Sequence, residues 1–164
     1  MYRRTLGLGF ILALSLVALA VAGCGQAANA NGPGGNTSAP NVHIGTHTAT
    51  VGGQSETVLT NDAGMTLYYF DADSATASAC SGACLQNWPP LLTAGIPSFD
   101  TSLKGTVSYL DDAAGRQATY NGHPLYTYAG DHAAGDTTGD GIKGQWHVAT
   151  PDIKDISSSG GYSY

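Results

Sequence analysis

The stretch that decides the fold runs from Gly64 to Trp88 and reads GMTLYYFDADSATASACSGACLQNW. It returns from Gly122 to Trp146 as GHPLYTYAGDHAAGDTTGDGIKGQW, at a constant offset of 58 residues and without a gap. The offset places like residues in register: Leu67 on Leu125, Tyr68 on Tyr126, Phe70 on Tyr128, Asp73 on Asp131 and Trp88 on Trp146. Self-similarity at a fixed period over this length indicates a duplicated structural unit.

The pattern around these two copies is typical of an all-β domain. Apolar stripes at helical spacing are interrupted by Gly or Pro throughout, whereas short β-branched and aromatic runs alternate with turn signals. We predict strands over Thr46–Val51, Glu56–Thr60, Thr66–Asp71, Thr106–Leu110, Gln117–Tyr120, Leu125–Ala129 and Gln145–Ala149. Only Cys80–Asn87 is typical of a short helical turn, which the following Pro89-Pro90 would end.

Turn residues predict how the strands connect. Asn121-Gly122 favours a tight hairpin in which both central residues take positive φ, so Gln117–Tyr120 should pair with Leu125–Ala129. We expect the same hairpin in the first copy, with its turn at Asn61–Gly64. The prediction is a single domain over 42–150, built from two β repeats at about 46–92 and 104–150 that are related by a pseudo-twofold axis.

The N-terminus is typical of an export signal. Arg3 and Arg4 precede a short apolar run that ends in Val21-Ala22-Gly23-Cys24. The last four residues resemble the lipobox of bacterial lipoproteins, in which the cysteine is acylated, for example with palmitate, and becomes the new N-terminus. We therefore predict a signal peptide at 1–23 and lipidation of Cys24, followed by a flexible tether over 24–41 that is rich in Ala, Asn, Gly and Pro.

Charge and cysteine content narrow the compartment and the partners. Loss of residues 1–23 leaves four basic side chains against twelve acidic ones, a net charge of about −8. Such a surface repels phosphate backbones, so nucleic acid is excluded as a partner and the membrane is contacted through the lipid. Outside the cytoplasm, the remaining cysteines, Cys80 and Cys84, are expected to form a disulfide. The C-terminal segment 151–164 is predicted to be a tail.

The repeated aromatic motif has two interpretations. Residues two apart on a strand share a face, so the rings of each copy point the same way. The favoured interpretation is a buried core, with each aspartate accepting hydrogen bonds from loop N–H groups or a neighbouring hydroxyl. The alternative is a glycan-binding platform, which requires exposed Tyr and Trp faces. The motif residues are Tyr68, Phe70, Asp73, Trp88, Tyr126, Tyr128, Asp131 and Trp146.

This pattern resembles the bacterial secreted-repeat lipoproteins, a family defined by a Tyr-x-aromatic-x-x-Asp motif. The resemblance rests on the segments Gly64-Met65-Thr66-Leu67-Tyr68, Trp88-Pro89-Pro90, Asn121-Gly122-His123-Pro124-Leu125-Tyr126, Gly130-Asp131 and Gly144-Gln145-Trp146. It covers nearly all of the folded part. It implies a repeat, export and lipid anchoring, and it implies no biochemical activity.

Metal binding is the sharpest chemical alternative. Met and His together suit copper or an axial haem ligand set, and the candidates are Met65, His123, His132 and His147. No closed ligand spacing connects them, so no cofactor is assigned. Aspartates 131, 136 and 140 lie in a Gly-rich loop but lack the alternating spacing of a calcium loop.

These features predict a non-enzymatic, extracytoplasmic lipoprotein that acts as a binding or structural module for an unidentified ligand. No Gly-x-Ser-x-Gly or His-Glu-x-x-His motif is present, and Glu56 is the one glutamate of the chain. An extracytoplasmic metal or electron-transfer protein is the first alternative, and a glycan-binding protein is the second.

Overall fold

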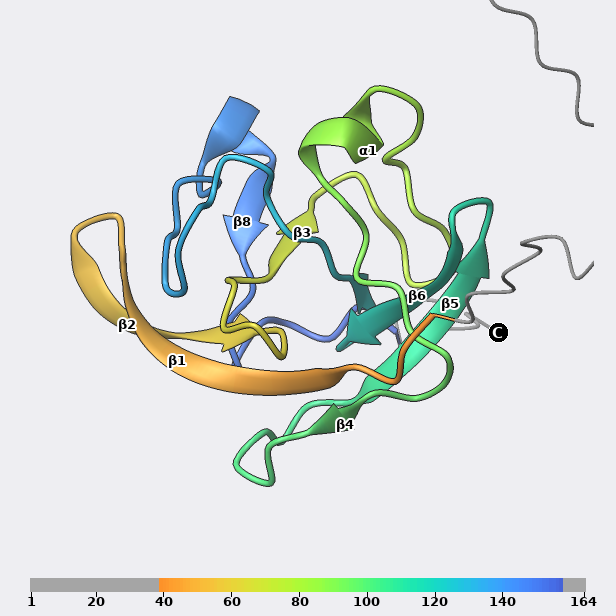
Figure 1. Ribbon diagram of the computed structural model, residues 1–164, viewed down its shortest axis with the longest axis horizontal. Coiled ribbons are helices and arrows are strands. Elements are labelled where there is room, and N and C mark those ends of the chain that lie inside the picture. Colours follow the sequence, from red (N-terminus) through yellow and green to blue (C-terminus); the bar gives the residue numbers. More distant parts are fainter. Residues whose placement is uncertain (1–38, 158–164) are drawn as a thin grey trace, which may run out of the picture. The chain divides into compact units, whose positions relative to one another are not determined.

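Ten short elements make up the part of the chain that the computed structural model describes, residues 39–157 (Figure 1). In order they are β1 (His43–Val51), β2 (Gln54–Thr60), β3 (Tyr68–Phe70), α1 (Cys84–Asn87), β4 (Ser98–Phe99), β5 (Val107–Asp112), β6 (Gly115–Tyr120), β7 (His123–Pro124), η1 (Ile142–Gly144) and β8 (Trp146–Val148). The fold is all-β, as predicted. The predicted signal peptide, Cys24 and most of the tether lie outside the described residues.

Each repeat begins with an antiparallel hairpin. β1 pairs with β2 through a two-residue turn, Gly52-Gly53, in which both residues have positive φ (56° and 85°). In the second repeat β5 pairs with β6, with Asp112 opposite Gly115. β2, β5 and β6 extend beyond the predicted strands toward the hairpin tips, because the turn residues leave the ladder intact there. β1 extends at its start instead, where its first residues pair with β4.

The predicted turn at Asn121-Gly122 is confirmed. Asn121 and Gly122 have φ values of 50° and 81°, and Tyr120 lies opposite His123 across the turn. A side chain on Gly122 would lie 2.7 Å from the backbone nitrogen of Ser157, so this position requires glycine for both conformation and space.

The prediction of a strand over Leu125–Ala129 is wrong. The strand ends at Pro124, and the following segment donates N–H groups from Thr127 and Ala129 to the carbonyls of Pro89 and Asn87. No regular ladder forms there, because prolines have no N–H to donate in return. At the equivalent place in the first repeat, β3 pairs regularly with β8, which contains no proline.

The two repeats meet at Tyr68 and Tyr126. The N–H of each donates to the carbonyl of the other, at 2.8 and 3.0 Å. On the outer sides, Tyr68 lies opposite Val148 and Tyr126 lies opposite Pro90, which is again an offset of 58 residues. The pseudo-twofold axis therefore passes between the two tyrosines, and four antiparallel segments lie side by side across it.

The helical turn predicted within Cys80–Asn87 is present as α1, and η1 occupies the equivalent position in the second repeat. One element was not predicted: β4 pairs in parallel with the start of β1, with His43 opposite Ser98. A two-residue strand carries too little alternation to be recognised from sequence.

Two apolar clusters fill the domain. One lies among the hairpins and consists of Val42, Ile44, Leu59, Leu67, Leu91, Leu103, Ala118, Tyr120, Leu125 and Ala149. The other surrounds the twofold axis and consists of Ala49, Val58, Tyr68, Cys80, Trp88, Tyr126, Trp146 and Val148. Both clusters draw residues from both repeats, so neither repeat has a complete core of its own.

The packed chain continues past Thr150 to the end of the described residues. Tyr120 donates its hydroxyl hydrogen to the carbonyl of Pro151 at 2.8 Å, and the side-chain amide of Asn121 donates to the carbonyl of Ile153 at 2.8 Å. Ile153 also packs against the hairpin cluster. Residues 151–157 therefore contribute to the fold, although the sequence pattern placed them in the tail. None of the described helices is long and apolar enough to span a bilayer.

Candidate functional site at the repeat interface

The repeated motif connects the two repeats to each other. Tyr68 donates its hydroxyl hydrogen to Asp131 Oδ2 at 2.7 Å, and Tyr126 donates to Asp73 Oδ2 at 2.8 Å. In both bonds the tyrosine comes from one repeat and the aspartate from the other. The motif therefore acts in pairs across the twofold axis.

The second oxygen of each aspartate holds its own long loop. Asp73 Oδ1 accepts the N–H of Ala79 at 2.7 Å, and Asp131 Oδ1 accepts both the N–H and the hydroxyl of Thr138, at 3.0 and 2.6 Å. The expectation that these aspartates accept loop N–H groups and a hydroxyl is confirmed. Each aspartate thus fixes a loop in one repeat and a tyrosine in the other.

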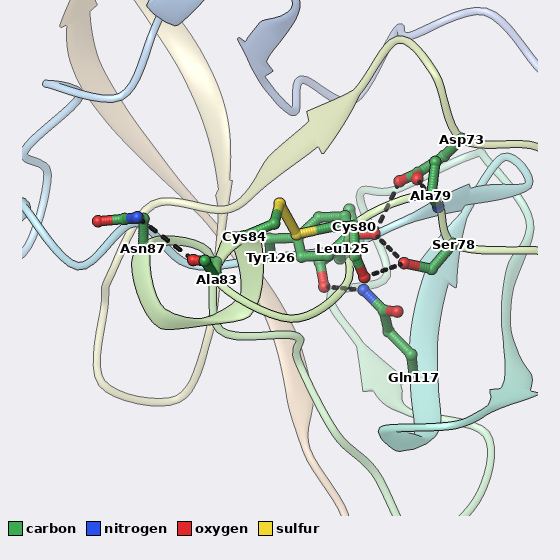
Figure 2. The surroundings of a disulfide bond; sticks show 10 residues. All are labelled: Asp73, Ser78, Ala79, Cys80, Ala83, Cys84, Asn87, Gln117, Leu125 and Tyr126. Atoms are coloured by element: carbon green, nitrogen blue, oxygen red, sulfur yellow. Dashed lines mark hydrogen bonds between the residues drawn. A yellow bond between two sulfur atoms is a disulfide. The ribbon is translucent and has the colours of Figure 1, made fainter.

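Burial changes the titration of these groups. Removal from water raises the pKa values of Tyr68 and Tyr126 well above their ordinary value, and the neighbouring aspartates contribute to the rise. Burial also raises the pKa of Asp73 to about 6, against the opposing effect of the hydrogen bonds from Ala79 and Tyr126. Figure 2 shows the hydrogen bonds around Asp73 and Tyr126, where Ser78 Oγ also lies 2.7 Å from the Tyr126 hydroxyl.

A stack of four aromatic rings crosses the interface. Trp88 and Trp146 lie parallel, with ring centroids 3.8 Å apart and planes 1° apart. Phe70 covers the outer face of Trp146 at 4.4 Å, and Tyr128 covers that of Trp88 at 4.5 Å. Both faces of each indole are therefore occupied by another ring.

These contacts decide between the two interpretations of the motif. Tyr68 and Tyr126 are fully buried, and only 5% of Trp88 and 3% of Trp146 is exposed. The glycan-binding alternative required free faces on these rings, and the stack leaves none on the tryptophans. The core interpretation accounts for their positions.

The predicted disulfide between Cys80 and Cys84 is present, with the two Cα atoms 5.4 Å apart. It closes the first turn of α1 onto the preceding loop (Figure 2). In the second repeat Thr138 occupies the position of Cys80, and its two hydrogen bonds to Asp131 hold the loop instead. Both repeats thus fix this loop through the motif aspartate, and the first repeat adds the disulfide.

A hollow of about 280 Å³ opens between α1 and η1, beside the aromatic stack. Its lining consists of Phe70, Ala83, Cys84, Asn87, Trp88, Lys143, Gln145 and Trp146. Lys143 was not identified from the sequence, where its position in a Gly-rich loop gives no signal. In the structure it has a positive φ of 55°, unusual for a residue with a side chain.

The metal-ligand candidates are only partly brought together. His123 and His147 both lie against Tyr69, with ring centroids at 4.6 and 5.3 Å. Their Nε2 atoms are already engaged, by the carbonyl of Lys154 at 2.9 Å and by Asp71 at 3.0 Å.

The remaining candidates lie elsewhere. Met65 closes the turn after Asn61 through its backbone, and His132 is exposed, with its N–H donating to Asp136. Asp140 accepts the N–H of Val148, so the aspartates of this loop do not converge. Within residues 39–157 no group of three His, Cys, Asp or Glu side chains is arranged to hold a metal.

The geometry defines a class of protein: a duplicated all-β domain whose two copies are held together by reciprocal tyrosine–aspartate bonds and a shared aromatic stack. A family described as a secreted repeat of unknown function matches this chain over residues 49–92 and 110–150, one segment in each repeat. These segments make up more than half of the chain, which therefore belongs to that family. No curated protein and no solved structure matches the chain.

Proposed function

We propose that this protein is a non-enzymatic module of the bacterial cell envelope, held on the extracytoplasmic side of a membrane by lipid on Cys24. The non-enzymatic assignment rests on the hydrogen bonds that occupy the polar groups of the repeated motif. The hydroxyls of Tyr68 and Tyr126 and the carboxylates of Asp73 and Asp131 are bonded to one another and to loops. Groups used in this way stabilise a scaffold and are not free to transfer protons to a substrate.

The start of the domain supports the anchored arrangement. The carbonyl of Pro40 accepts the N–H of Ala94, and that of Val42 accepts the N–H of Ser98, so the tether joins the domain beside β4. The exposed large apolar side chains among the described residues, Ile96 and Phe99, lie on this same segment. The tether predicted over 24–41 would have a mean reach of ~20–25 Å and would keep this end of the domain close to the lipid.

The anchor is tested by metabolic labelling with an alkyne-tagged palmitate in a bacterial host that expresses the full chain. We expect label on the wild-type protein, none on Cys24→Ser, and accumulation of the unprocessed chain when globomycin is added. The double variant Cys80→Ala/Cys84→Ala is the matched control and should keep its label, because those cysteines form the disulfide. Membrane association that is unchanged in Cys24→Ser would contradict the proposal.

The module is proposed to bind neither nucleic acid nor a resident metal. The mature chain carries a net charge of about −8, which disfavours polyanionic partners. His123 and His147 use their Nε2 atoms for hydrogen bonds within the protein. Metal analysis of the purified protein tests this part: stoichiometric copper, iron or haem would favour the electron-transfer alternative instead.

A further inference from the structure

The hollow between α1 and η1 lies on the pseudo-twofold axis. Two pairs of its lining residues, Asn87 with Gln145 and Trp88 with Trp146, are related by the 58-residue offset. The hollow is therefore formed by both repeats together, and a single repeat would supply only one side of it. Binding sites in proteins are frequently formed between two such units.

The floor of the hollow presents ring edges. Because Phe70, Tyr128 and the partner indole cover the faces of the two tryptophans, each indole can reach the hollow only by its edge. The edge of an aromatic ring is the positive part of its quadrupole, whereas the face is negative. Such a floor attracts an electron-rich ring or an anionic group.

The rim of the hollow adds hydrogen-bond donors, which also attract electron-rich or anionic groups. Asn87 and Gln145 are both exposed, and the side-chain amide of Asn87 makes only a long bond of 3.4 Å, to the carbonyl of Ala83 (Figure 2). Lys143 contributes an exposed ammonium that forms no ion pair with any residue in 39–157. In a chain with a net charge of about −8, Lys143 places one positive charge at this hollow.

The position of Lys143 is costly to the backbone. It adopts φ 55° between Gly141 and Gly144, which also have positive φ. A residue with a side chain in this region costs of order 1 kcal/mol or more, and such positions cluster at ligand sites. Its counterpart in the first repeat is Leu85, which packs against the cluster around the axis. The positive charge is therefore present on one side of the hollow only, so a ligand with one anionic group would bind in a single orientation.

Size limits the ligand to one ring. Ligand pockets usually measure ~300–1,000 Å³, and this hollow of about 280 Å³ is at the small end. We infer that the hollow is a binding site for a small aromatic carboxylate, with the ring over Phe70 and the indole edges, the carboxylate on Lys143, and further polar substituents on the amides of Asn87 and Gln145.

This inference rests on the binding role in the proposed function and does not depend on the lipid anchor. The labelling experiment tests only the anchor, and the binding experiment tests only the hollow. The chain contains two tryptophans, and both line the hollow. Tryptophan fluorescence therefore reports on this site alone. The probe is para-hydroxybenzoate, titrated into the full mature protein purified in detergent. Two control ligands each lack one of the recognised groups: acetate has the carboxylate but no ring, and benzyl alcohol has the ring but no charge.

We expect a saturable fluorescence change with para-hydroxybenzoate and a much weaker response to acetate and benzyl alcohol. Lys143→Gln should weaken binding by roughly tenfold or more, since a charge-assisted hydrogen bond contributes about 1.5–3 kcal/mol. Lys143→Arg should retain most of the affinity. Lys154→Gln, which removes an exposed lysine elsewhere, is the matched control and should bind as the wild type does.

Two results would overturn the inference. One is the absence of a saturable change with the wild-type protein. The other is equal weakening by Lys143→Gln and Lys154→Gln, which would show that the effect comes from net charge and not from this site. Because Lys143 is exposed, its substitution should leave folding intact, and a melting temperature measured for each variant establishes this. Asn87→Ala and Gln145→Ala give a second, independent measurement at opposite sides of the hollow.

Discussion

The hydroxyl of Tyr126 lies 2.8 Å from Asp73 Oδ2, and the two residues belong to different repeats. The corresponding bond from Tyr68 to Asp131 makes the contact reciprocal. The two bonds are not equivalent in chemistry. Asp73 accepts two hydrogen bonds and Asp131 accepts three. The second partner of the Tyr126 hydroxyl is the hydroxyl of Ser78, whereas that of the Tyr68 hydroxyl is the N–H of Gly139 at 3.3 Å, which can only donate.

The first prediction concerns the pH dependence of stability. The pKa of Asp73 is about 6 in the folded protein and ~3.9 in an unfolded chain. Between about pH 4 and pH 6 the folded state binds a proton that the unfolded state has lost. The contribution of Asp73 to the free energy of unfolding is therefore full below about pH 4 and is lost as the pH rises through 6.

Because Asp73 is only partly buried, solvent screening limits this contribution to about 1–2 kcal/mol. Asp73→Asn imitates the protonated carboxyl, since its amide can donate to Tyr126 while Tyr126 donates to Ser78. Urea unfolding of the wild type and the variant over this pH range measures the difference. The variant should gain stability relative to the wild type as the pH rises, and a constant difference would show that Asp73 does not titrate there.

The second prediction is that Asp131→Asn is destabilising at neutral pH, in contrast to Asp73→Asn. Asp131 accepts three hydrogen bonds, and the donor Tyr68 is fully buried. An amide cannot accept all three, so a buried donor loses its partner at a cost of about 1–3 kcal/mol. Urea unfolding measures this cost. Glu56→Gln, at an exposed position of β2, serves as the control and should change stability by less than about 0.5 kcal/mol.

The third prediction concerns the disulfide. Closing the short loop from Cys80 to Cys84 should stabilise the domain by about 2 kcal/mol. Cys80→Ala/Cys84→Ala should lose this amount and should be insensitive to reductant, whereas the wild type should lose it only when reductant is added. Equal stability of the wild type with and without reductant would mean that the bond from Ala79 to Asp73 and the aromatic stack fix this loop without help from the disulfide.

The fourth prediction concerns the end of the domain. A chain that stops at Thr150 lacks the carbonyls of Pro151 and Ile153, which accept hydrogen bonds from Tyr120 and Asn121. Two buried groups lose their partners, so the free energy of unfolding should fall by about 2–4 kcal/mol. A chain that stops at Ser157 keeps both contacts and is the control. Thermal unfolding of the two chains should separate them, and equal melting temperatures would place 151–157 outside the fold.

The duplication, the strands of the hairpins and the turn at Asn121-Gly122 were predictable because each depends on local signals. A fixed offset, a period of two and a residue pair that favours positive φ are all visible in the chain. The strand predicted over Leu125–Ala129 is absent because of the residues that lie opposite it, and not because of its own sequence. Pro89 and Pro90 are distant in sequence, and only the fold shows that they lie opposite and cannot donate.

The candidate site was less predictable than the fold. The motif implied buried rings and a bonded aspartate, and both are present. That the bonds cross between repeats depends on the position of the twofold axis, which no local pattern specifies. Lys143 and the amides of Asn87 and Gln145 belong to loops without periodicity, so their convergence on one hollow is a property of the tertiary structure alone.

Because every tyrosine–aspartate bond spans the boundary between repeats, half of this chain would leave its own phenol and carboxylate without partners. The same reciprocity means that a second molecule can supply the missing half. Two repeats produced as separate chains would have to form all of these bonds in trans.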